Sequence, residues 1–172
     1  MPRRAGSSAD WKAIRELCCD TGDGGEPIED DRQAFGEFWI GPYQRLFPDF
    51  GHILEEGGRV VGYLVGCPNT QDLKRLAAAE PLIGRMSAAE KRYPPEAIAR
   101  LADYPAHLHI NLAAPCRGRR LGDLLIGRFK AQVGGIHLFC RAGPLPFYLR
   151  IGFRELARTI DEPARFLLVM EP

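Results

Sequence analysis

Six consecutive residues, Arg117-Gly118-Arg119-Arg120-Leu121-Gly122, connect an apolar run that ends at Leu112 with an apolar helical pattern that starts at Leu121. A strand that enters a helix through such a turn leaves backbone N–H groups without partners at the positive end of the helix dipole. Phosphate oxygens are natural partners for these groups. Gly118 permits unusual φ angles, and Gly122 removes a side chain where a ligand would approach the backbone. The turn therefore indicates a phosphate site, although strand-turn-helix connections with two glycines are also common without a ligand.

The run before this turn, HLHINL at 107–112, alternates with period two. Alternation in a strand places the leucine and isoleucine side chains on one face and His107, His109 and Asn111 on the other. Either histidine could accept a proton near neutral pH, or each could have only a structural role. The amide of Asn111 cannot act as a base. Cys116 has no activating partner that the sequence identifies, so we interpret it as a packing residue.

Three motifs resemble those of the GNAT superfamily of N-acetyltransferases. Residues 117–122 are similar to its R/Q-x-x-G-x-G/A acetyl-CoA signature, with Arg120 where the signature prefers glycine. Residues 147–153, FYLRIGF, are similar to its F-Y-x-x-x-G-F segment, and Gly62-Tyr63 resembles the end of its V-V-G-Y strand. The HLHI run and the long segment before it resemble a bacterial branch related to the acetyltransferase-like domain of O-GlcNAcases.

The resemblance implies an acetyl-CoA-dependent N-acetyltransferase that moves an acetyl group to a primary amine of a small molecule or protein by direct attack. It implies that Tyr148 is the general acid at the CoA sulfur, with packing as the alternative role. From the polar face of the strand, His109 or His107 could take the amine proton, directly or through water. Arg128 or Lys130 would meet the 3′-phosphate, and no metal is expected. The implied contacts with acetyl-CoA come from Leu112, Ala113, Arg117, Gly118, Arg119, Arg120, Leu121, Gly122, Asp123 and Tyr148.

Two departures from the family pattern keep a second function open. Arg141 stands where the family often has asparagine, and Asn111 stands where related sequences often carry aspartate. The alternative is a catalytically inactive GNAT-fold protein that binds a ligand or partner without turnover.

For the fold, the resemblance implies an α/β (α+β) architecture: a mixed, mostly antiparallel central sheet with helices on both faces and a helical insertion before the fourth strand. We expect one domain over residues 1–172, with the insertion at about 69–105 and the acetyl-CoA-binding core at 106–158.

The sequence pattern predicts the individual elements. It predicts a helix capped by Asp10 and a glycine-rich connector after it, then a helix with an aromatic stripe from Phe35 to Leu46 that Gly41-Pro42 kinks or divides. A hairpin is expected at 52–55 and 60–67, around two glycines. The pattern from Leu121 to Val133 predicts a helix with a continuous apolar stripe that includes Leu124, and short strands are expected at 136–140, near 153 and at 165–170.

Composition limits the classes of function. The 172 residues carry a net charge of +1, and 45% are hydrophobic, as in ordinary globular proteins. Basic side chains outnumber acidic ones from Arg117 to Arg158 without interleaved aromatic platforms, which favours a phosphorylated ligand over nucleic acid. The five cysteines show no zinc or disulfide spacing. We expect a cytoplasmic protein that does not bind membranes, and a homodimer is left open.

Overall fold

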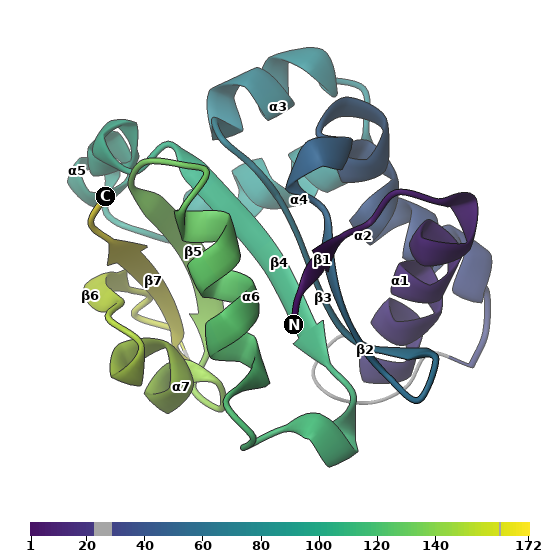
Figure 1. Cartoon of the computed structure of the whole chain (residues 1–172). Helices are drawn as coiled ribbons and strands as arrows, with labels where there is room; N and C mark the ends of the chain where they lie inside the picture. Colours follow the sequence, from purple (N-terminus) through teal and green to yellow (C-terminus); the bar gives the residue numbers. More distant parts are fainter. Residues whose placement is uncertain (23–28, 162) are drawn as a thin grey trace. The chain divides into compact units, whose positions relative to one another are not determined.

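The computed structural model (Figure 1) describes residues 1–22, 29–161 and 163–172. It contains two compact units. Unit 1 comprises Met1–Cys67 and His109–Gln132, and unit 2 comprises Pro68–Leu108 and Val133–Pro172. Strand β4 (Ala106–Leu112) begins in unit 2 and ends in unit 1. The described strands form a seven-stranded sheet in the order β1-β2-β3-β4-β5-β7-β6, which is mixed and mostly antiparallel, as predicted.

In unit 1, the predicted hairpin is confirmed. Strands β2 (His52–Glu56) and β3 (Arg59–Cys67) pair antiparallel, with Ile53 opposite Tyr63. Gly57 and Gly58 form the turn with φ angles of 56° and 75°, which glycine adopts at low cost. The short strand β1 (Arg3–Arg4) adds to the other side of β2. Sequence did not predict β1, because two residues are too few to show an alternating pattern.

Helix α1 (Ser8–Thr21) begins with a capping box: the Ser7 side chain accepts from the Asp10 backbone, and the Asp10 carboxylate accepts from the Ser7 backbone. The prediction that Asp10 is itself the cap is therefore wrong; Ser7 takes that position. The predicted glycine-rich connector lies largely at residues 23–28, outside the described residues.

Helix α2 (Arg32–Leu46) continues through Gly41 and Pro42, so the predicted division does not occur there. Proline removes one backbone hydrogen bond, but the helix is held by burial of Ile40 and Tyr43 on the same stretch. A 3₁₀ turn, η1 (Pro48–Phe50), follows directly.

Helices cover both faces of the β2-β3 hairpin in unit 1. A methyl group added at Gly62 would meet Leu112 and the Leu125 side chain of α6 (Leu121–Lys130), so this position points toward α6. The next residue, Tyr63, interacts with Cys18 of α1 and therefore points to the opposite face. The hairpin thus separates the α6 layer from the layer of α1 and α2.

Helix α6 is shorter and less continuously apolar than its sequence pattern predicts. Leu125, Ile126 and Phe129 are buried, and the Phe129 ring lies 6.2 Å from that of Phe50. Leu124, expected in the apolar stripe, is 43% exposed, and the helix ends at Lys130.

In unit 2, the predicted helical insertion is present as α3 (Thr70–Leu76), α4 (Pro81–Glu90), α5 (Pro95–Ala99) and the 3₁₀ turn η2 (Arg100–Asp103). Its two ends meet: the Thr70 backbone and hydroxyl both donate to the Pro105 carbonyl, at 2.8 and 2.9 Å. An ion pair between Lys74 and Glu90, at 2.6 Å, joins α3 to α4. The insertion is therefore an ordered part of unit 2.

The strands of unit 2 follow the predicted order. Strand β5 (Ile136–Arg141) pairs parallel with β4 and antiparallel with β7 (Arg165–Met170), which also pairs with β6 (Arg154–Arg158). Helix α7 (Leu145–Arg150) precedes β6, and Gly152, between α7 and β6, has a φ of 102°.

Among the described residues, no helix has the length and apolar character needed to cross a membrane.

Candidate functional site

The turn between β4 and α6 is the predicted phosphate site. After β4, the 3₁₀ turn η3 (Ala114–Cys116) leads into residues 117–120, and α6 starts at Leu121. Gly118 has a φ of 76° and Arg120 a φ of 60°, and both angles lie in the left-handed region. A methyl group at Gly118 would meet no other atom within 4 Å, so backbone conformation and not space explains the glycine.

The amides of this turn are available to a ligand. In the described part of the chain, no N–H group of residues 118–122 donates a hydrogen bond to a protein acceptor. The Asp123 amide, one residue further on, donates to the Arg120 carbonyl at 3.2 Å. Gly118, Arg119 and Arg120 are exposed. The N-terminal end of α6 therefore has N–H groups without protein partners beside three exposed residues, while Gly122 itself is buried.

The arginines of the turn have different partners. Arg117 donates through Nε to the Leu112 carbonyl at 3.3 Å, and the Arg120 guanidinium lies 4.0 Å from Asp123. The Arg120 side chain is 78% exposed and extends into solvent. Arg120 is therefore accessible to an incoming anion.

Glu56 on β2 forms an ion pair with Arg119, the third arginine of the turn. Arg119 donates to both Glu56 carboxylate oxygens, at 2.6 and 3.0 Å, and also contacts the buried Cys116 sulfur at 3.6 Å. The Arg119 guanidinium lowers the pKa of Glu56, so the carboxylate stays ionised and its charge is neutralised beside the turn. Sequence analysis did not identify Glu56, because its partner lies 63 positions away.

The backbone before the turn is engaged with the protein. The Ala113 N–H donates to the Val61 carbonyl at 2.9 Å, and the Leu112 carbonyl accepts from Arg117. The expected contacts of Leu112 and Ala113 with the pantetheine arm stay a prediction.

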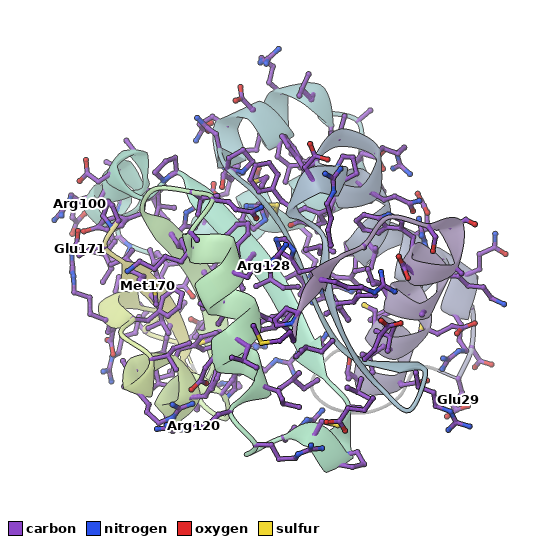
Figure 2. All side chains as sticks on the ribbon, viewed as in Figure 1. Glu29, Arg100, Arg120, Arg128, Met170 and Glu171 are labelled. Atoms are coloured by element: carbon purple, nitrogen blue, oxygen red, sulfur yellow. The ribbon has the colours of Figure 1, made fainter. Side chains whose placement is uncertain are left out.

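Figure 2 shows Arg120 and Arg128 toward opposite ends of α6. Because a helix rises about 1.5 Å per residue, Arg128 lies about 12 Å along the helix axis from Arg120.

The predicted polar face of β4 contains a connected group around His109 in unit 1. Asn111 donates through Nδ2 to the Tyr63 hydroxyl at 2.8 Å, and this hydroxyl lies 3.3 Å from His109 Nδ1. The Trp39 indole of α2 stacks on the His109 ring at 5.1 Å and 14°. Burial raises the pKa of Tyr63 well above its usual value, so the phenol keeps its hydrogen. Trp39, part of the predicted aromatic stripe, lies partly exposed on the histidine.

His107, the other candidate base, lies in unit 2 and is 8% exposed. Its Nδ1 is 2.9 Å from the Thr70 hydroxyl, which donates its own hydrogen to the Pro105 carbonyl. The ring also lies 5.8 Å from that of His137. His107 therefore contacts the point where the two ends of the insertion meet.

Tyr148, the predicted general acid, lies on α7 in unit 2. Its ring is buried and packs at 5.4 Å against Phe153. Burial raises the pKa of Tyr148, and Cys140 raises it further, so the phenol is protonated at neutral pH. No described residue forms a hydrogen bond with its hydroxyl, and the hydroxyl oxygen is not among the buried unpaired atoms. The hydroxyl oxygen therefore keeps a small exposed area on an otherwise buried side chain.

The departure at Arg141 lies at the end of β5, where Arg141 pairs with Arg165 of β7. Residues 142–144 form a tight turn that leads directly into α7, with the Leu145 amide donating to the Ala142 carbonyl at 3.2 Å. Residues 142–144 are thus a short connection between β5 and α7.

Solved structures with a similar fold include that of SsHAT, which is 25% identical over 99% of this chain and 97% of that chain, with a TM-score of 0.74. A polyamine N-acetyltransferase of Drosophila melanogaster is 15% identical over 100% and 99% of the two chains, with a TM-score of 0.64. This chain has the fold of the GNAT acetyltransferases. No family model matches the sequence.

The NatC complex bound to Gag peptide and CoA also has this GNAT fold, at 11% identity over 100% of this chain and 98% of that chain, with a TM-score of 0.61. The resemblance to the GNAT superfamily that the sequence motifs indicate is therefore confirmed. Acyltransferase is the class of these neighbours, in agreement with the class predicted from the sequence.

Proposed function

We propose that this protein is an acetyl-CoA-dependent N-acetyltransferase whose turn at residues 117–122 binds the CoA diphosphate. One observation carries the proposal: the amides of residues 118–122 have no protein acceptor in the described part of the chain, although they open the ten-residue helix α6. Consecutive N–H groups at a helix N-terminus are the arrangement that binds phosphate oxygens. The presence of CoA in the NatC structure, which has the same fold, supports this ligand.

The charges around the turn support an anionic ligand. The exposed guanidinium of Arg120 adds positive charge to the helix dipole, and the pairing of Glu56 with Arg119 removes the nearby carboxylate charge that would repel a diphosphate. A guanidinium offers a planar pair of donors to phosphate oxygens. The turn therefore combines backbone donors with the exposed cation of Arg120.

In the proposed reaction, acetyl-CoA supplies an activated acetyl thioester, the amine nitrogen forms a bond to its carbonyl carbon, the C–S bond breaks, and the amine loses a proton. The protonated Tyr148 hydroxyl donates a proton to the departing sulfur. The amine proton leaves through the polar face of β4, which carries His107 and His109. Neighbours with this fold are named for a polyamine and for a complex with a peptide, so the acceptor differs among them.

Calorimetric titration with acetyl-CoA tests the diphosphate site. Arg120→Glu places a negative charge beside the free amides and should weaken binding at least tenfold, while the exposed Lys12→Glu of α1 makes the same charge change away from the turn and should leave affinity within about twofold. Wild-type protein that does not bind acetyl-CoA, or equal affinity in the two variants, would contradict the proposal.

The alternative function is a GNAT-fold binding protein without turnover. Arg141 at the end of β5 favours it, as does the absence of a carboxylate at position 111, where the Asn111 amide is engaged with Tyr63. Release of free CoA from acetyl-CoA, followed with a thiol reagent across a panel of amines, separates the two functions. Tight binding with no release by any amine would favour the inactive protein.

A further inference from the structure

The turn at residues 117–122 has little backbone hydrogen bonding to hold its shape. None of the amides of residues 118–122 donates to a protein acceptor in the described part of the chain. Arg120 nevertheless has a φ of 60°, in the left-handed region, where a residue with a side chain is strained. Such a conformation persists only where the surrounding contacts fix it. The turn therefore needs an anchor outside its own backbone.

Arg119, the residue directly before Arg120, provides such an anchor within unit 1. Its guanidinium donates to both carboxylate oxygens of Glu56, at 2.6 and 3.0 Å. This two-pronged arrangement is the stronger and more directional form of an ion pair. Glu56 is the last residue of β2 and pairs with Arg59 at the end of the hairpin. The ion pair therefore connects the turn to a strand.

The segment between β4 and Arg119 is attached to the same hairpin. At its start, the Ala113 N–H donates to the Val61 carbonyl of β3 at 2.9 Å. Within it, the buried Cys116 sulfur contacts both members of the ion pair, at 3.6 Å from Arg119 Nη1 and 3.9 Å from Glu56 Oε2. The β2-β3 hairpin thus holds this segment at both ends, once through the backbone and once through side chains.

We propose that Glu56 is a positioning residue for acetyl-CoA: through Arg119 it holds the turn in the conformation that presents the amides of residues 118–122 to the diphosphate. This inference rests on the proposed acetyltransferase function. A loop that is already ordered binds more tightly, because less conformational entropy is lost on binding. In this role the Glu56 carboxylate strengthens the binding of an anion, although its charge alone would repel that anion.

The direction of one effect separates positioning from charge. Glu56→Gln removes a negative charge beside the turn and also one half of the ion pair. Charge alone would tighten acetyl-CoA binding, whereas loss of the anchor should weaken it about fivefold in calorimetric titrations. Glu55→Gln is the matched control, because this neighbouring carboxylate of β2 pairs with Arg3, and it should leave the affinity within about twofold.

Two further substitutions test the pair itself. Arg119→Lys keeps the charge but loses the two-pronged geometry, so it should weaken binding by a similar factor. Added to Glu56→Gln, it should weaken binding by less than about twofold more, because the pair is already broken. Glu56→Asp keeps both carboxylate oxygens on a shorter side chain and should bind acetyl-CoA more tightly than Glu56→Gln does.

Tighter binding by Glu56→Gln, or wild-type affinity in Arg119→Lys, would overturn the proposal. The first result would show that the carboxylate acts through its charge, and the second that the geometry of the pair does not matter. Urea midpoints equal to that of the wild type show that the variants are folded.

Nuclear magnetic resonance tests the turn without a ligand. In ¹⁵N relaxation measurements on the labelled full chain, the order parameters of residues 118–121 should be near the rigid value of about 0.85 in the wild type and in Glu55→Gln, and should fall toward about 0.6 in Glu56→Gln. Equal order parameters in all three proteins would refute the anchoring role. If the wild type does not bind acetyl-CoA, the proposed function fails and Glu56 has no cofactor to position, while this experiment still decides whether Glu56 orders the turn.

Discussion

The Asp10 carboxylate forms a two-pronged ion pair with the Arg3 guanidinium, with distances of 2.7 and 2.9 Å. The same carboxylate accepts from the backbone amides of Gly6 and Ser7 at the start of α1. Asp10 is buried, and the guanidinium of Arg3, together with the two amides, holds its pKa well below its usual range. This pair joins strand β1 to the first helix.

Asp10→Asn should lower the free energy of unfolding by about 2 kcal/mol at pH 7, because it weakens the charged hydrogen bonds of a buried group. A lowered pKa means that the ionised carboxylate stabilises the fold above about pH 4 and that this contribution is lost as the pH falls further. Urea unfolding at pH 7 and pH 3 should therefore show a smaller difference at pH 3. The exposed Asp20→Asn on α1 is the control, with an expected loss below about 1 kcal/mol. A pH-independent difference for Asp10→Asn would contradict the ion-pair explanation.

The neighbouring glycines 134 and 135 should respond oppositely to alanine. A methyl group at Gly135 would lie 2.7 Å from the Asp103 carbonyl and 3.1 Å from the Tyr104 Cα, and backbone atoms cannot move aside easily. Gly135→Ala should therefore cost about 1–3 kcal/mol. A methyl group at Gly134 meets nothing within 4 Å, so Gly134→Ala should be neutral or stabilising by up to about 1 kcal/mol. Denaturant titrations that rank the variants in the reverse order would show that this contact is absent.

Tyr148→Phe should slow acetyl transfer by about 10²-fold in kcat, because it removes the proposed proton donor and keeps the buried ring. Acetyl-CoA affinity should change little. Tyr93→Phe is a matched control, since Tyr93 is a buried tyrosine of the same unit, and it should leave kcat within about twofold. An equal effect of the two substitutions, or no effect of the first, would remove Tyr148 from the mechanism.

His137 should make the protein less stable in mild acid. It is 1% exposed, Nδ1 donates to the Tyr104 carbonyl at 2.6 Å, and Nε2 has no partner among the described residues. Burial lowers its pKa, although Tyr104 and Glu90 raise it in part, and Lys74 lowers it further. The folded state thus favours the neutral ring, whereas the unfolded chain takes up a proton below about pH 6.5.

The free energy of unfolding should therefore fall between pH 7.5 and 5.5, by at most about 1.4 kcal/mol per pH unit for one such histidine. His137→Leu should reduce this slope. Part of the slope should persist, because burial also lowers the pKa of His52 in unit 1. Urea unfolding curves at several pH values measure the slope, and identical slopes for wild type and His137→Leu would show that His137 does not titrate as described.

Local sequence patterns were sufficient to predict most of the helices and strands. The hairpin around Gly57 and Gly58, the helical insertion, strand β4 and the turn into α6 all follow from hydrophobic periodicity and from residues with special backbone conformations. The predictions were wrong where another nearby residue could cap the helix, or where tertiary packing outweighed the local backbone preference. Ser7 replaced Asp10 as the cap of α1, and burial of Ile40 and Tyr43 kept α2 continuous through Pro42.

By itself, the sequence determined that a glycine-containing turn precedes α6 and that His107, His109 and Asn111 share a strand face, because both properties depend only on residues close together in the chain. Only the tertiary structure decided that Glu56 neutralises Arg119 and that Trp39 and Tyr63 surround His109. Those partners come from other strands and helices. Which side chains meet across such distances depends on how the elements pack, and the spacing of residues along the sequence does not predict these contacts.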